Sequence, residues 1–149
     1  MYLLFFSAFS VLGADQYCKH KIRKDTGLPR SCFRGRIVLC FSKNRGMFMN
    51  LLQNHPRLVS ALTGILLLFL SFGAVFSCQR GASRLFRLAF GLLLGGGASN
   101  VYDHLVHGFV TDYISFCRPK KLSHIVYNLA DFAIFLSVIL FAASEISDT

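Results

Sequence analysis

The stretch that decides the fold is LVSALTGILLLFLSFGAVFSC, Leu58 to Cys78, which contains no charged side chain. A helix rises about 1.5 Å per residue and the hydrocarbon core of a bilayer is about 30 Å thick, so roughly 20 apolar residues are needed to cross it. This stretch is long enough. It predicts a membrane-spanning helix, and therefore a membrane protein.

Three further stretches complete the predicted membrane domain. One is nearly as apolar apart from an aspartate, and two contain shorter apolar runs that could span by tilting or by local thinning of the bilayer. With 54% of its 149 residues hydrophobic, the chain is too apolar for a soluble fold of this size. We expect an all-α membrane protein, a four-transmembrane-helix bundle forming a single domain over 1–149, with approximate spans 2–18, 58–78, 86–103 and 125–144. The opening MYLLFFSAFSVLGA also has the length of a secretory signal peptide, although no basic residue precedes its apolar run.

The order of the spans places the two long links, 19–57 and 104–124, on the same face of the membrane. Each closes an antiparallel helix pair, and only the short middle link emerges opposite. The first link contains the patterns GLPRS and GRIVLCFSKN, which predict a turn and a strand and therefore folded structure outside the membrane. The long links carry thirteen of the sixteen Lys and Arg residues, while the middle link, QRGASRLFR, carries three arginines. Because folded loops are a poor guide to orientation, the composition leaves orientation open.

The net charge of +9 would suggest nucleic acid in a soluble protein. Here the basic residues lie between apolar segments, without stacking aromatics on a polar face, so we expect them to contact membrane lipids with anionic headgroups, and no nucleic acid.

The candidate site residues come from two polar stretches, NVYDHLVHGFVTDYISF at 100–116 and YNLADFAIF at 127–135. In each, an asparagine is followed three residues later by an aspartate: Asn100 and Asp103, then Asn128 and Asp131. On a helix, residues three apart lie on one face, so both pairs can point into the bundle.

A third carboxylate, Asp112, lies between these pairs. The segment GFVTDYISF alternates after a turn expected at Gly108, so Asp112 shares one side of an extended segment with Val110 and Ile114. Asp131 is expected about two turns inside the last span. An unpaired carboxylate at the bilayer centre costs about 2.5 kcal/mol or more, so aspartates near the membrane need a compensating reason.

Two reasons are available. Asp103 is expected to be structural, hydrogen-bonded to Asn100, to backbone amides or to a basic side chain. For Asp112 and Asp131 we favour chemistry: two carboxylates that meet in a poorly solvated place share one proton, as an aspartic protease requires. The ionised member then takes a proton from a water molecule, and the protonated member hydrogen-bonds the carbonyl that is attacked.

Other readings fit the residues less well. His104 and His107 could contribute to a zinc site, but no HExxH helix is present. A Cys117/His124 nucleophile pair would have nothing local to orient it. A proton- or ion-coupled transporter would place acidic residues near the bilayer midplane on several helices, whereas here they gather toward one face. The glycine run GLLLGGGASN is explained by close helix packing at Gly95, Gly96, Gly97 and Ala98.

In these blocks the sequence resembles the lipoprotein signal peptidases, the bacterial signal peptidase II family of four-span aspartyl proteases. ADQYCK resembles the family's Asp-Gln-x-x-Lys block, and KNRGMFMNLL its Asn-x-Gly block. GGGASNVYDHLVHGFVTDYISF resembles the Gly-rich Asn-x-x-Asp block that runs into Val-x-Asp-Phe, and VYNLADFAI the Asn-x-Ala-Asp block. The four blocks occur in order across most of the chain.

The resemblance implies a catalytic pair, Asp112 and Asp131, that works without metal or cofactor. It implies supporting or substrate-binding roles for Asp15, Asn44, Asn100, Asp103, His104 and Asn128. The implied substrate is a prolipoprotein whose lipobox cysteine carries diacylglycerol and which is cut just before that cysteine. The implied location is the bacterial inner membrane, crossed several times, with the active site toward the extracytoplasmic face and both termini inside. The resemblance also implies that the first link forms an extracytoplasmic cap with a small β-cradle and an interfacial helix. We expect a monomer.

Two departures from the family pattern matter. The family usually has Gly where this chain has Ser99, and Arg where this chain has His104. Loss of that always-charged donor could loosen the site or make it pH-sensitive, because histidine titrates near neutrality. The alternative is therefore a catalytically weakened or non-catalytic paralogue that binds lipidated peptides or a membrane partner.

Overall fold

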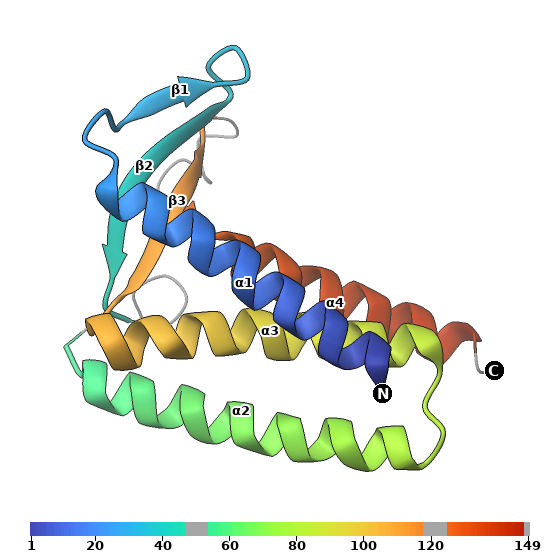
Figure 1. Cartoon of the computed structure of the whole chain (residues 1–149). Helices are drawn as coiled ribbons and strands as arrows, with labels where there is room; N and C mark the ends of the chain where they lie inside the picture. Colours follow the sequence, from blue (N-terminus) through green and yellow to red (C-terminus); the bar gives the residue numbers. More distant parts are fainter. Residues whose placement is uncertain (47–53, 118–124, 148–149) are drawn as a thin grey trace.

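The computed structural model describes residues 1–46, 54–117 and 125–147, which form four long helices and one small sheet. The helices are α1 (Tyr2–Lys24), α2 (Pro56–Gln79), α3 (Arg84–His107) and α4 (Leu129–Ser147). Figure 1 shows them lying alongside one another, with the sheet at one end and the start of α1 and the end of α4 at the other. The fold is therefore mostly helical with a small antiparallel cap.

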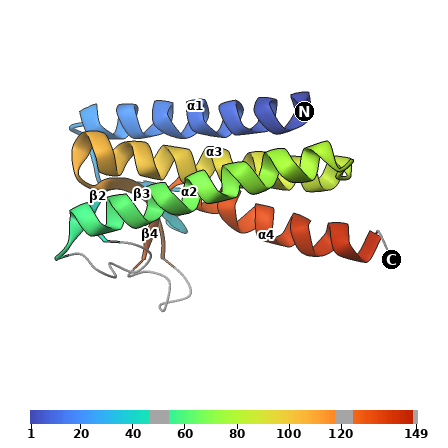
Figure 2. The ribbon, with the colours of Figure 1, turned by 90° about the horizontal axis from the view of Figure 1, so that it is seen from below.

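Helix α3 is the centre of the bundle and contacts each of the other three helices. Figure 2 shows α1 on one side of it and α4 on the other. The glycine run makes this possible: a Cβ on Gly95 would collide with the backbone of Ala8 in α1, and one on Gly96 would lie 2.7 Å from the carbonyl oxygen of Ala130 in α4. The predicted packing role of these glycines is confirmed.

Helix α3 also runs four residues beyond the predicted boundary at Asp103. It ends at His107 and is capped by Gly108, whose φ of 74° is left-handed and whose N–H donates to the carbonyl of His104. Nothing between Asp103 and Gly108 breaks a helix, so the glycine decides where it stops. The predicted turn at Gly108 is confirmed, and His104 belongs to the helix rather than to the loop.

The sheet joins segments that are far apart in the chain. Its strands are antiparallel in the order β1 (Arg30–Cys32), β2 (Ile37–Asn44), β3 (Val110–Phe116) and β4 (Val126–Tyr127). In the β2–β3 pairing Ser42 lies opposite Asp112. The strands expected in the first link and around Asp112 are therefore present. The described part of the first link contains no helix of its own between α1 and α2; residues 47–53 lie outside the description.

Helix α4 begins later than predicted. The expected span started at residue 125, but Val126 and Tyr127 form β4 and the helix starts at Leu129. The reason is a reciprocal cap: the side chain of Asn128 accepts from the N–H of Asp131 at 2.9 Å, and the Asp131 carboxylate accepts from the N–H of Asn128 at 3.0 Å. Asp131 is thus in the first turn of α4, not two turns inside it.

Large apolar side chains cover the outward faces of the helices. Phe6 on α1, Phe72 on α2 and Phe135 on α4 are exposed by 73%, 75% and 68%. Within the described residues, one helical segment, Arg57–Gln79, is long and apolar enough to cross a membrane, and Leu129–Ser144 is a shorter apolar helix. The bundle thus presents to its surroundings the surface that a soluble protein buries.

Candidate active site

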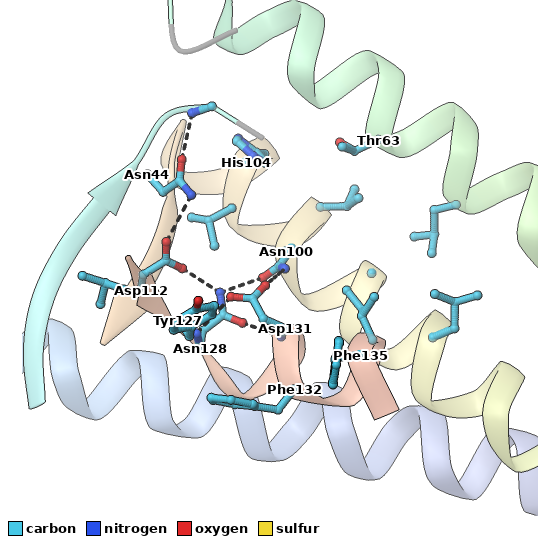
Figure 3. Close-up of a pocket in the computed structure, with 18 of the residues that line it drawn as sticks. Asn44, Thr63, Asn100, His104, Asp112, Tyr127, Asn128, Asp131, Phe132 and Phe135 are labelled. Carbon is cyan, nitrogen blue, oxygen red and sulfur yellow. Dashed lines mark hydrogen bonds between the residues drawn. The ribbon is translucent and has the colours of Figure 1, made fainter. Parts of the chain in front are cut away.

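A cavity of about 700 Å³ opens between α2, α3 and α4 beneath the sheet. Most of its wall is apolar, but the side chains that line it also include the polar groups of Asn44, Asn100, His104, Asp112, Asn128 and Asp131. Figure 3 shows Asp112, Asn128, Asp131 and Asn100 turned toward one another, linked by hydrogen bonds. The structure therefore brings together the two aspartates and three asparagines named from the sequence.

Asp112 stands on β3 and is only 4% exposed. Its two carboxylate oxygens accept from Asn128 Nδ2 at 2.7 Å and from Asn44 Nδ2 at 3.1 Å. Burial, and after it the charge of Asp131, raises the pKa of Asp112 to about 7. A carboxyl group in this position carries a proton at neutral pH for a large part of the time.

Asp131 faces Asp112 from the first turn of α4. One oxygen accepts from Asn100 Nδ2 at 3.1 Å and the other from the backbone N–H of Asn128 at 3.0 Å. A helix N-terminus favours negative charge, and both hydrogen bonds are donated to the carboxylate.

Asn128 connects the two acids. Its Nδ2 donates to Asp112 and, at 3.2 Å, to Asn100 Oδ1, while its backbone N–H and side-chain oxygen hold Asp131. Because one fully buried residue fixes both carboxylates, their relative position is set by a single rigid cap.

Behind the acids lies a buried ionic network centred on Lys19, which is fully buried. Its ammonium lies 2.8 Å from the Asp15 carboxylate and 3.4 Å from that of Asp103, and it donates to Asn100 Oδ1 at 2.9 Å. Sequence reasoning did not select Lys19 as a site residue, and it assigned the basic residues as a class to lipid headgroups. The available signal was its spacing of four from Asp15, within the block ADQYCK that resembles the family's Asp-Gln-x-x-Lys.

Asp103 has the structural surroundings expected of it, with partners from α1 and β3. Arg23 Nη1 lies 3.2 Å from one oxygen and the backbone N–H of Thr111 donates to the other at 2.9 Å. Arg23 also donates to the Thr111 hydroxyl at 3.0 Å, so the residue before Asp112 is held twice. The amide of Asn100, which the sequence predicts beside Asp103, donates to Asp131 instead.

Asp15 ties α1 to the start of α4. It accepts from the Tyr113 hydroxyl and from the backbone N–H of Leu129, both at 3.1 Å, and from Ser99 Oγ at 2.6 Å. Burial and the Asp15 charge raise the pKa of Tyr113, so its hydroxyl remains a donor. Ser99, one of the two departures from the family pattern, is thus part of this network.

His104, the other departure, is buried at the cavity wall, where its imidazole hydrogen-bonds the backbone of Gly46. Its Nδ1 has no partner among the described residues. No group of three or more His, Cys, Asp or Glu side chains that could hold a metal ion occurs in the described ranges, and His124 lies outside them.

Comparison with known proteins shows the family and the fold of this chain. The model of the signal peptidase II family matches residues 7–147. The lipoprotein signal peptidase of Caldicellulosiruptor bescii is 32% identical over 127 residues, covering 85% of this chain and 79% of that protein. The lipoprotein signal peptidase of Azoarcus sp. strain BH72 is 32% identical over 136 residues, covering 88% and 75%.

A solved structure of a bacterial membrane enzyme shares the fold. Its TM-score is 0.82 at 20% identity, with 97% of this chain and 88% of that chain covered. Because the family model spans nearly the whole sequence and the relatives cover most of it, this chain belongs to the signal peptidase II family and is a peptidase.

Proposed function

We propose that the protein is a membrane-embedded aspartic endopeptidase that removes the signal peptide from diacylglyceryl-modified prolipoproteins, cutting before the lipidated cysteine. The observation that carries this proposal is the pairing of Asp112 and Asp131 through Asn128 at one buried cavity, with the pKa of Asp112 raised to about 7. The names of the similar proteins support the substrate class.

In this mechanism the pair shares one proton, which resides mainly on Asp112. Asp131, at the start of α4, takes a proton from a water molecule between the two groups. The water oxygen attacks the scissile carbonyl, and Asp112 donates a hydrogen bond to the carbonyl oxygen as it becomes tetrahedral. Collapse of this intermediate breaks the C–N bond, and the proton held by Asp131 passes to the departing nitrogen.

The shape of the cavity supports a lipidated peptide as substrate. Away from the acids its wall is mostly apolar, with Leu66 and Leu70 from α2 and Ile134 and Val138 from α4. A peptide lying across the aspartates could place its acyl chains against this wall, where they would be removed from water.

The proposal includes the placement of the protein in the membrane. The protein is a monomer and all four of its helices cross the bilayer. The sheet caps the extracytoplasmic side, and both termini lie inside the cell. The exposed Phe side chains on α1, α2 and α4 support this placement. Membrane lipids would then surround most of the helical surface.

Replacing either acid tests the chemistry. Asp112→Asn and Asp131→Asn are each expected to lower the rate of cleavage of a synthetic diacylglyceryl lipobox peptide by about 100-fold or more, because each removes a proton acceptor or donor in the transition state. Asp25→Asn is the matched control, since Asp25 lies outside the cavity and its partners are Arg30 at 3.5 Å and the backbone N–H of Gly27 at 2.8 Å. A chelator should leave cleavage unchanged.

Undiminished cleavage by either active-site variant would end the proposal. Wild-type protein that binds the peptide without cleaving it at any pH would favour the non-catalytic alternative.

A further inference from the structure

The turn between β1 and β2 exposes an aromatic side chain and two guanidinium groups at the edge of the molecule. Phe33 is 75% exposed, and Arg34 and Arg36 beside it are also exposed. None of the three lines the cavity. The proposed peptidase chemistry therefore does not account for them.

The backbone of this turn is unusual. Phe33 and Arg34 have φ angles of 51° and 57°, and Gly35 follows at 80°. Residues other than Gly, Asn and Asp rarely adopt the left-handed region, and strained positions of this kind cluster at functional sites. Asn or Gly would make the same turn at lower cost, so the sequence keeps Phe and Arg at a position that favours neither.

The turn also lies where it could reach a membrane surface. In Figure 1 the sheet extends sideways from the end of the bundle, and the β1–β2 turn lies beyond α1, leaning back in the direction in which the helices run. If the helices span the bilayer as proposed, this orientation brings the turn toward the lipid headgroups rather than away from them.

The positive charge of the β1–β2 turn indicates which kind of membrane surface it would bind. Residues 30–37 contain Arg30, Arg34 and Arg36 and no acidic residue, and Asp25 is the carboxylate that pairs with Arg30. Arginine side chains bury their stems while the guanidinium binds phosphate, and aromatic rings favour the interfacial region.

We propose that the β1–β2 turn anchors the cap to the membrane, with the Phe33 ring in the interfacial region of the bilayer and Arg34 and Arg36 on the phosphates of anionic phospholipids. The inference rests on the proposed membrane placement of the helices, and it is independent of the aspartate chemistry.

The chain contains no tryptophan, so Phe33→Trp introduces a single fluorescent probe at the turn. This variant is reconstituted into nanodiscs of phosphatidylcholine alone and of phosphatidylcholine mixed with phosphatidylglycerol. The expected result is blue-shifted emission that is quenched by brominated acyl chains, more strongly with phosphatidylglycerol. Adding Arg34→Gln and Arg36→Gln should lower the ratio of docked to undocked turn by about fivefold per arginine on the anionic bilayer.

A matched control removes the same charge elsewhere. Lys21→Gln with Lys24→Gln neutralises two exposed lysines at the end of α1 and should leave the quenching of the introduced indole unchanged. Emission typical of water-exposed tryptophan, without quenching in either bilayer, would overturn the proposal. Equal quenching in both bilayers would overturn its anionic specificity. Cleavage by the same preparations reports separately on the active site, so failure of the anchor and failure of the peptidase proposal are distinguishable.

Discussion

At the scale of single residues, the two aspartates depend on side chains that do not line the cavity. Lys19 binds Asn100 Oδ1, which leaves the amide nitrogen of Asn100 to donate to Asp131. The repeated Asn-x-x-Asp spacing made Asn100, Asn128 and Asp131 predictable, and the alternation of its segment did the same for Asp112. The burial of Lys19 was not predictable, because a lysine near the end of an apolar stretch in a basic chain normally snorkels to headgroups, and only the fold shows that it is fully buried.

Lys19→Met is expected to destabilise the protein by about 3 kcal/mol or more, because it leaves Asp15 and Asp103 buried with one cation fewer. It should also lower kcat more than it raises KM, since Asn100 would lose the contact that orients it toward Asp131. Thermal unfolding in detergent and cleavage kinetics measure the two effects. Lys21→Met, at an exposed lysine on the same helix, is the control and should change stability by only about 0.5 kcal/mol. An orienting role for Lys19 would be refuted by a variant with unchanged kcat.

The pH dependence follows from Asp112. Its pKa is raised from 3.8 to about 7, so the group keeps its proton below that pH and loses it above. The pair then has no acid left, and kcat is expected to fall as pH rises through about 7. The hydrogen bond from Asn44 favours the ionised form, so Asn44→Ala should move this alkaline limb to higher pH.

Thr63→Ala provides the comparison for the pH profile. Thr63 also lines the cavity, but its hydroxyl bonds the carbonyl of Val59 in its own helix at 2.7 Å. This variant should keep the wild-type limb. If Asn44→Ala and Thr63→Ala both leave the limb in place, Asp112 is not the group that sets it.

At the scale of elements, similar local patterns acquired different roles. The Asn-x-x-Asp spacing occurs inside α3 at Asn100–Asp103 and across the start of α4 at Asn128–Asp131. Apolar periodicity does not distinguish a pair inside a helix from a pair at its start. Asn128 and Asp131 were therefore predicted inside a membrane span, although they form the capping box of α4. The pairing of Ser42 with Asp112 joins two segments distant in the sequence, and local sequence does not encode such a register. Strand content was therefore predictable, whereas the approach of Asn44 to Asp112 was not.

At the scale of the whole molecule, the distribution of charge and the proposed orientation point in opposite directions. Most basic residues lie in the two links at the sheet end, which simple counting would keep inside the cell. The structure offers a physical reason to discount part of that count. Lys19 and Arg23 are neutralised by Asp15 and Asp103 within the bundle, so they do not act as free loop charges.

Cysteine labelling decides the orientation. Cys117 is exposed at the sheet end, and Gln79 is exposed at the opposite end, where α2 ends. We expect that a variant retaining only Cys117 is modified by a membrane-impermeant maleimide in intact spheroplasts. A variant whose single cysteine is Gln79→Cys should react only after the membrane is permeabilised. Labelling of both variants after permeabilisation is the control that both thiols are accessible. The opposite pattern would place the aspartates on the cytoplasmic side, where a peptidase could not meet a signal peptide after export. The proposed substrate would then have to be abandoned even if the two acids proved catalytic.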